Sequence, residues 1–227
     1  MDYQFDFSFL SANWRELLDG AWLTLRMSVA TIVLGFVLGT ALAVARTQGP
    51  AWARRCVTGY VDVIRNTPLV IQAFWLFFGL AAVHVRVPAM AAAVLALVVN
   101  VSAYTTEIVR AGIESVPRGQ LEAASCLGLS RWQVLRLVVL PQAVERMYPA
   151  LISQFVLMML ATSIMSQISA EELTAVGYRI QSETFRGFEI YIVIAVVYLV
   201  LSWLLRLSMA GVGAIAFTRR RRLKTAL

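Results

Sequence analysis

Charged residues are scarce in this chain of 227 residues. Asp, Glu, Lys and Arg make up 15% of it, whereas 59% of the residues are hydrophobic. This composition excludes disordered, collagen-like and coiled-coil chains, and it lacks the polar residues that cover a cytosolic enzyme. Lipid must replace water around so much apolar surface. The composition therefore indicates an integral membrane protein.

Residue types that carry chemistry are also rare. Lys224 is the only lysine, so the chain has no Gly-Lys-Ser/Thr loop of the kind that binds nucleotide phosphates. His84 is the only histidine, and no pair of carboxylates falls inside a segment that is predicted to span the membrane. A gradient-driven carrier normally needs ionisable groups within its membrane spans. We therefore expect no catalytic residue, no metal site and no cofactor in this chain.

Long stretches without charge are abundant instead. There are five of them: residues 27–45, 66–83, 87–106, 147–170 and 190–205. Each reaches or approaches the roughly 20 residues that a helix needs to cross a hydrocarbon core about 30 Å thick. The sequence therefore predicts an all-α integral membrane fold, with five transmembrane helices in one domain over 1–227. Gly35 and Gly39 have the four-residue spacing that is typical of close helix packing in membranes.

The distribution of charge predicts the orientation. Acidic residues dominate 1–19, whereas arginine dominates 46–65 and the basic tail at 219–227. Loops rich in Lys and Arg stay in the cytoplasm, which places the N-terminus outside and the C-terminus inside. We interpret the basic tail as a topology anchor near anionic lipid and not as a nucleic-acid site. Cys56 and Cys126 then fall in reducing cytoplasmic segments, so we expect free thiols and no disulfide.

The longest connection, about forty residues, separates the third and fourth stretches on the predicted cytoplasmic side. Residues 120–127 have the pattern of a short helix that Gly128 ends, because glycine readily takes a left-handed cap. Ser130 and Gln133 have the spacing of a capping box at the start of a second helix. We expect this second helix to end at Pro141, which lacks a backbone N–H. Two short helices joined at a glycine predict a docking element.

Motifs of wide spacing resemble the permease subunits of ABC-type importers. Glu122-Ala123-Ala124 is followed by Gly128 and later by Val138 and Leu140-Pro141, in a pattern similar to the EAA signature of that family. Other segments resemble its polar amino acid branch, the histidine, glutamine and arginine permease type. These segments are residues 65–69, 103–108, 110–112, 115–120, 140–143 and 185–189. The resemblance covers about residues 20–210.

The resemblance implies a fold like that of type I ABC importer permeases, in the inner membrane of a bacterium. It also implies the partners: a second permease subunit that is the same chain or a paralogue, ATPase subunits that bind ATP and Mg²⁺, and an extracytoplasmic solute-binding protein that delivers an amino acid. Residues 107–146 would form the cytoplasmic coupling loop. The residues expected to couple to the ATPase are Gln120, Glu122, Ala123, Ala124 and Gly128. The alternative function is a gradient-driven amino acid exchanger or channel that works without an ATPase.

Polar side chains within apolar spans are the candidates for the substrate path, because an amide or hydroxyl in hydrocarbon needs a partner. The candidates are Thr67, Gln72, Asn100, Tyr104, Ser153, Gln154, Thr162 and Ser163. Relatives often carry a charged pair just before the Thr-Ser of the fourth span, where this chain has Leu160 and Ala161. Either polar side chains and helix ends hold the substrate here, or the partner permease supplies the charged contacts.

Overall fold

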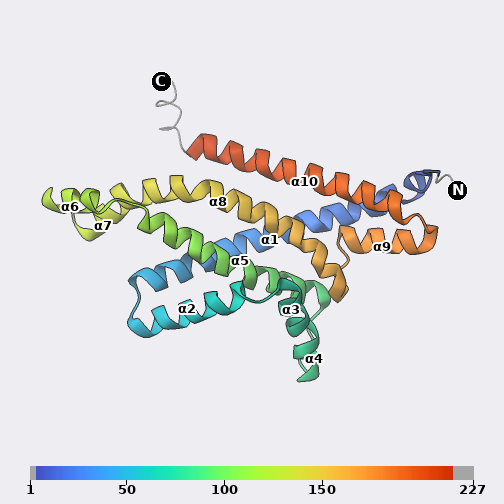
Figure 1. Cartoon of the computed structure of the whole chain (residues 1–227), viewed down its shortest axis with the longest axis horizontal. Helices are drawn as coiled ribbons and strands as arrows, with labels where there is room; N and C mark the ends of the chain where they lie inside the picture. Colours follow the sequence, from blue (N-terminus) through green and yellow to red (C-terminus); the bar gives the residue numbers. More distant parts are fainter. Residues whose placement is uncertain (1–3, 217–227) are drawn as a thin grey trace.

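The computed structural model describes residues 4–216, and this part of the chain is helical almost throughout, without a β-strand. The α-helices are α1 (Phe9–Gln48), α2 (Ala51–Arg65), α3 (Leu69–Phe74), α4 (Leu80–Ala82), α5 (Ala89–Glu114), α6 (Arg118–Cys126), α7 (Arg131–Gln133), α8 (Leu140–Ala161), α9 (Leu173–Thr184) and α10 (Gly187–Ala216). π-Helical turns occupy Trp75–Gly79 and Val134–Val139, and a 3₁₀ helix occupies Thr162–Ile168. The long helices extend along the molecule, with α6 and α7 at one end and the N-terminus and α9 at the other (Figure 1). The predicted basic tail at 219–227 lies outside the described residues.

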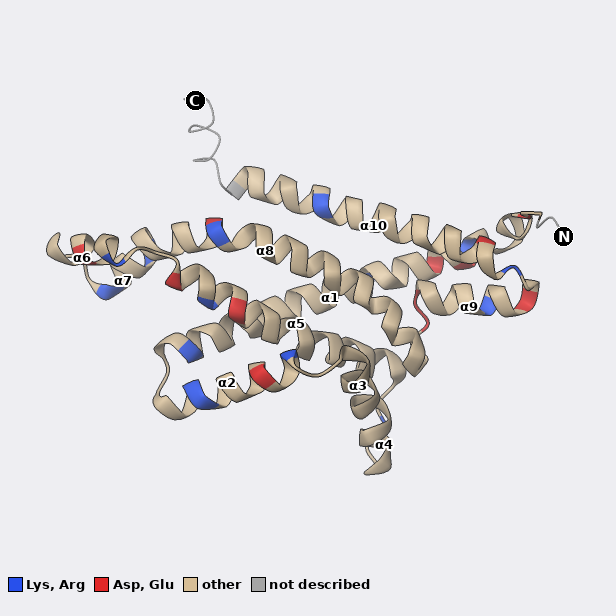
Figure 2. Ribbon diagram, in the orientation of Figure 1, with Lys and Arg blue, Asp and Glu red and all other residues tan. Residues whose placement is uncertain are grey.

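Within the described part of the chain, four helices are long and apolar enough to cross a membrane. They span Phe9–Gln48, Ala89–Glu114, Arg131–Ile168 and Gly187–Ile215. A fifth span results if α2 and the segment Leu69–Ala82, which are bent by 107°, count as one. Charged residues gather toward the ends of α5, α8 and α9, and long central stretches of the helices carry none (Figure 2). The predicted all-α membrane fold is confirmed.

The first span is longer than predicted. Helix α1 begins at Phe9 and not near residue 27, and its 40 residues extend about 60 Å at 1.5 Å per residue. Its first half packs against α9 and α10, where Leu17 shares an apolar cluster with Ile180. The search for uncharged stretches missed this half because it carries charges such as Glu16, which pairs with Arg179 at 2.7 Å.

The second predicted span, 66–83, contains one helical segment, Leu69–Ala82, which reaches the length of a span only together with α2. Helix α2 ends at Arg65, and the chain turns before α3 begins at Leu69. Pro68 causes this break, because proline has no backbone N–H and its ring clashes with the preceding turn of a helix. Helix α2, which we expected in a cytoplasmic connection, packs against α5 instead, through an apolar cluster that includes Val61 and Ala103.

Helices α1 and α5 approach closely at the glycines of α1. The hydroxyl of Thr106 donates a hydrogen bond to the backbone oxygen of Gly39 at 3.1 Å. A Cβ atom at position 39 would lie 2.7 Å from the backbone oxygen of Ser102. The prediction that Gly35 and Gly39 serve helix packing is therefore confirmed.

The prediction that Pro141 ends a helix is wrong. The π-helical turn at Val134–Val139 joins α7 to α8, and one helix continues from Arg131 to Ile168. The carbonyl with which a proline ring would clash in an α-helix is that of the residue four positions back, here Leu137, and it lies inside the π-helical turn. A π-helical turn is a known site of helix irregularity, so the helix can continue through the proline. The predicted coupling loop, 107–146, consequently shrinks to residues 115–130, and the remainder belongs to α5 and to the start of the fourth long span.

Glu172 is a fully buried acid at the end of the molecule that carries α9. It is the N-cap residue of α9, where its carboxylate accepts a hydrogen bond from the backbone N–H of Ala175 at 3.0 Å. The hydroxyl of Tyr198 donates to the same carboxylate at 2.5 Å, and the hydroxyl of Thr24 lies 3.5 Å away. This group therefore ties α1, α9 and α10 together. Burial raises the pKa of Glu172, because it disfavours the charged form.

We expect this raised pKa to make the fold less stable as pH rises. Between the ordinary pKa of 4.5 and the raised value, the folded chain binds more protons at Glu172 than the unfolded chain, so the free energy of unfolding falls with increasing pH. Thermal unfolding of the purified complex should therefore show wild type losing stability relative to Glu172→Gln as the pH rises above 4.5. Glu171→Gln, at an exposed neighbour, should follow wild type. Parallel pH profiles for wild type and Glu172→Gln would contradict the expectation.

Candidate functional site

A pocket of about 560 Å³ lies between α2, α3, α5 and α8. We call it the polar pocket. Its lining residues are Arg65, Asn66, Thr67, Pro68, Leu69, Asn100, Tyr104, Gln154, Leu157, Met158 and Ala161. Four of the predicted path residues, Thr67, Asn100, Tyr104 and Gln154, lie among them although they come from segments far apart in the sequence. The volume falls in the range of about 300–1,000 Å³ that is usual for small-molecule sites.

Gln72 holds one side of the polar pocket together. Its amide nitrogen donates to the hydroxyl of Thr67 and to the backbone oxygen of Ile64, both at 2.8 Å. Its amide oxygen accepts a hydrogen bond from the side chain of Asn100 at 3.0 Å. One glutamine on α3 thus fixes the turn after α2 and a polar side chain of α5. The bend between α2 and α3 is therefore also what forms this wall of the pocket.

Gln154 on α8 supplies the opposite wall. The side chain is buried, with 8% of its residue surface exposed, and it lines the pocket. No other residue in the described part of the chain forms a hydrogen bond with its amide. Its amide atoms remain accessible from the pocket. Gln154 is thus available to bind a polar molecule in the pocket.

Arg65 is a lining residue that the sequence analysis did not select. It is the last residue of α2, and its guanidinium carbon lies 5.2 Å from the ring centre of Tyr104. A guanidinium over an aromatic face is an attractive contact. In the sequence, Arg65 was part of the recognised motif and was used only to predict orientation. Its position beside Thr67 was the signal that could have identified it.

The remaining path candidates lie outside the polar pocket. Ser153 is exposed on another face of α8. Thr162 and Ser163 begin the 3₁₀ helix, and their hydroxyls donate to the backbone oxygens of Met159 and Leu160 at 2.6 and 2.7 Å. Ala161 lines the pocket, so an apolar residue faces the site at one of the two positions where relatives often carry charge.

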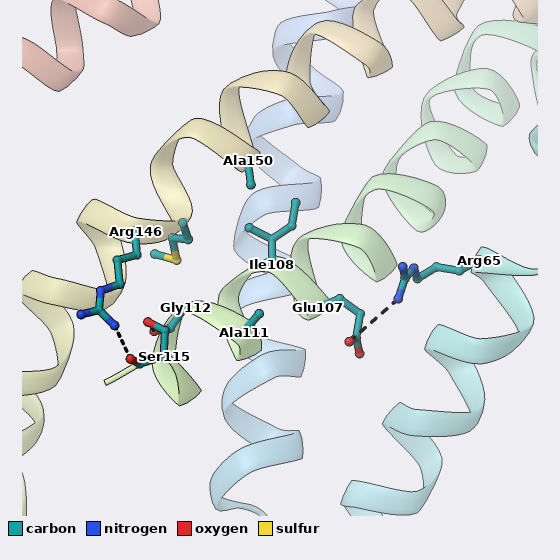
Figure 3. A pocket seen from close by; sticks show the side chains of 9 residues that line it. Arg65, Glu107, Ile108, Ala111, Gly112, Ser115, Arg146 and Ala150 are labelled. Atoms are coloured by element: carbon teal, nitrogen blue, oxygen red, sulfur yellow. Dashed lines mark hydrogen bonds and ion pairs between the residues drawn. The ribbon is translucent and has the colours of Figure 1, made fainter. Parts of the chain in front are cut away.

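A second pocket of about 380 Å³ adjoins the polar pocket, and Arg65 lines both. We call it the Glu107 pocket (Figure 3). Arg65 reaches from α2 toward Glu107 of α5, while Arg146 of α8 donates a hydrogen bond to the backbone oxygen of Ser115. This second pocket therefore lies between the polar pocket and the connection that leads to α6.

The turn between α6 and α7 has the predicted glycine geometry. Gly128 has a φ of 76°, and two hydrogen bonds close the end of α6, from Gly128 N–H to Ser125 at 3.0 Å and from Leu129 N–H to Ala124 at 3.3 Å. This pattern is the Schellman motif. The predicted capping box also forms, with Ser130 and Gln133 bonded reciprocally. These two caps fix the angle between α6 and the long helix that follows.

The predicted coupling residues do not all face the same way. Glu122 and Ala123 are exposed on α6. Ala124 is only 4% exposed and points into the chain, so its role in close approach to a partner is corrected to packing inside this subunit. The side chain of Gln120 accepts a hydrogen bond from Gln142 at 2.6 Å, which joins α6 to α8. The outward surface is thus formed by Glu122, Ala123 and the turn at Gly128.

Both cysteines, Cys56 and Cys126, are exposed free thiols, as expected. Among the residues from 4 to 216, no group of three or more His, Cys, Asp or Glu side chains is placed to hold a metal ion. The chemistry of the candidate site therefore rests on amides, hydroxyls and one guanidinium.

Residues 32–214 match the family described as the inner membrane component of binding-protein-dependent transport systems. The chain is 37% identical to the glutamine transport system permease protein GlnP of Escherichia coli K12, over 89% of this chain and 93% of that protein. It is 34% identical to the octopine transport system permease protein OccM of Rhizobium radiobacter, over 88% and 85% of the two chains.

Solved structures are also similar. A crystal structure of an amino acid ABC transporter with histidines matches with a TM-score of 0.86 and 34% identity, over 96% of this chain and all of that one. An inward-facing MetNI methionine ABC transporter matches with a TM-score of 0.77 and 20% identity, over 90% and 98% of the two chains. At that identity the second match supports the fold alone.

Proposed function

This chain belongs to the family of inner membrane components of binding-protein-dependent transport systems, and on that premise we propose that it binds an amino acid in the polar pocket during ATP-driven import. The observation that carries the proposal is the amide of Gln154, which forms no hydrogen bond with another described residue and lines the same pocket as Asn100 and Thr67. An amino acid has charged and polar groups that such a site can satisfy. The glutamine and octopine permeases among its relatives support the same substrate class.

The site also predicts how the chain works with partners. Five spans are few for enclosing a polar path, so a second permease subunit, either this chain or a paralogue, is expected beside it. ATPase subunits would bind ATP and Mg²⁺ and dock on the exposed surface formed by Glu122, Ala123 and Gly128. An extracytoplasmic binding protein would deliver the substrate at the opposite end. ATP binding by the motors would then shift the population between two packed states of the permease pair.

The proposal includes an orientation in the membrane. The end with α6 and α7 would lie in the cytoplasm, and the end with α9 would lie outside. The arginine-rich segments of the sequence favour this direction. The N-terminus would then be outside and the C-terminus inside.

Gln154→Leu tests the proposed site. In proteoliposomes that contain the complete transporter, ATP and the binding protein, uptake of L-glutamine should fall about tenfold or more, because the substrate loses a hydrogen bond to the pocket wall. Thr31→Val is the matched control, since the buried Thr31 hydroxyl of α1 has no hydrogen-bond partner within the described chain. It should transport at close to the wild-type rate.

The same assay addresses the alternative function. Amino acid uptake by the wild-type complex that continues without ATP and follows an imposed ion gradient would favour an exchanger or channel. Equal uptake by Gln154→Leu and Thr31→Val would exclude the polar pocket as the binding site.

A further inference from the structure

Arg65 belongs to an ion cluster that contains more cations than anions. Both carboxylate oxygens of Glu107 are already engaged, one by Arg46 and the other by Arg110 at 2.7 Å. Arg110 also binds Glu114 at 2.5 Å. Arg65 lies 3.9 Å from Glu107, the longest of these contacts. Three guanidinium groups thus share two carboxylates, and Arg65 is the least firmly held.

Arg65 also faces the polar pocket. It lines this pocket as well as the Glu107 pocket, and 41% of its side chain remains exposed. The contact with Tyr104, itself a lining residue, holds the guanidinium at the pocket wall. Among the lining residues in the described structure, Arg65 alone carries a charge. The pocket is therefore electropositive, and it offers no carboxylate to a bound cation.

We propose that Arg65 binds the carboxylate of the amino acid substrate, and that the polar pocket consequently selects amino acids whose side chains are neutral or acidic. The inference rests on the proposed function, since it names the substrate class of the same site. A guanidinium binds a carboxylate through two parallel hydrogen bonds, which are strong where little water competes. A cationic side chain would meet the like charge of Arg65, and none of the residues that line the polar pocket is acidic.

Glu107 competes with the substrate for Arg65. At 3.9 Å the contact between Arg65 and Glu107 is long. A substrate carboxylate on the pocket side can therefore bind the guanidinium in place of Glu107. Glu107 keeps Arg46 and Arg110 when that happens, so its own charge stays neutralised. Substrate binding therefore breaks the Arg65–Glu107 ion pair between α2 and α5, while the apolar contacts between these helices remain.

Binding to the purified complete transporter, without the binding protein, tests the proposal. The probes are L-glutamine, L-arginine and L-glutamine amide, in which an amide replaces the α-carboxylate. Wild type should bind L-glutamine roughly ten- to a hundredfold more tightly than the amide, which is the range for hydrogen bonds to charged groups. It should also bind L-glutamine more tightly than L-arginine.

Arg65→Gln should weaken L-glutamine binding by a similar factor and abolish the preference over the amide. Arg46→Gln is the matched control, because Arg46 contacts Glu107 but does not line the polar pocket; it should keep the preference. Glu107→Gln should bind L-glutamine at least as tightly as wild type. Arg65→Lys serves as a second variant if Arg65→Gln does not fold. It keeps the charge but loses the two parallel hydrogen bonds of the guanidinium. Its preference for L-glutamine over L-glutamine amide should therefore lie between those of wild type and of a variant without the charge.

An undiminished preference for L-glutamine over its amide in Arg65→Gln or Arg65→Lys would overturn the proposal. So would tighter binding of L-arginine than of L-glutamine by wild type. Either outcome would overturn the role of Arg65 while wild type still takes up amino acid with ATP. Failure of the proposed function would instead appear as the absence of ATP-driven uptake by wild type.

Discussion

Gly128→Val is expected to abolish the coupling of ATP hydrolysis to uptake while the membrane helices remain folded. Gly128 has a φ of 76°, a conformation that costs about 1–2 kcal/mol for residues with a Cβ and more for a β-branched side chain. No atom lies within 4 Å of a Cβ built at this position, so the effect comes from the backbone and not from a clash. The Schellman cap would open, and the angle between α6 and the following helix would change.

The measurement is substrate-stimulated ATP hydrolysis and uptake in proteoliposomes. Uptake should fall to about a tenth of wild type or less, as expected for the loss of a cap worth more than about 1.4 kcal/mol. Gly128→Asn is the matched control, because asparagine tolerates the left-handed conformation, and it should retain most of the uptake. Normal coupling in the valine variant would show that the turn does not set the docking geometry.

Gly39→Leu is expected to prevent the correct packing of the two central helices. A Cβ at this position would lie 2.7 Å from the backbone oxygen of Ser102 and 2.6 Å from the Cβ of Thr105. A backbone oxygen cannot move aside as a flexible side chain can, so α1 and α5 would have to separate. Overpacking of this kind costs about 1–3 kcal/mol or more, and the hydrogen bond from Thr106 to Gly39 would be lost as well.

Thermal unfolding of the purified complex and the yield of monodisperse protein report this effect. The midpoint of unfolding should fall by about 5 °C or more. Gly211→Leu on α10 provides the comparison, since a Cβ at Gly211 meets nothing within 4 Å, and it should unfold like wild type. Equal stability of the two leucine variants would mean that α1 and α5 are not held at this contact.

The sequence by itself determined the features that depend on composition or on residues close together in the chain. The apolar stretches were sufficient for the membrane class, because a helix in lipid satisfies its own backbone hydrogen bonds. The cap at Gly128 and the capping box at Ser130 were also predictable, since each is made by residues within one turn of the helix end. The close approach at Gly35 and Gly39 followed from their spacing alone.

Only the tertiary structure decided which polar residues meet. Gln72, Asn100 and Gln154 lie on three different helices, and the bend after Arg65 brings their segments to one pocket. Ala124 has a sequence context like that of Ala123, yet it faces inward because the following helix packs over it.

The tertiary structure also decided which charged side chains are buried and which groups surround them. Glu172 lies, in the sequence, between the apolar stretches 147–170 and 190–205, but α1, α9 and α10 enclose it. In the sequence, Arg65 contributed to the predicted orientation and to the segment 65–69, whereas the structure places it at two pockets and beside Glu107. The surroundings of a charge are set by helices distant in sequence, and no local pattern encodes which of them will cover it.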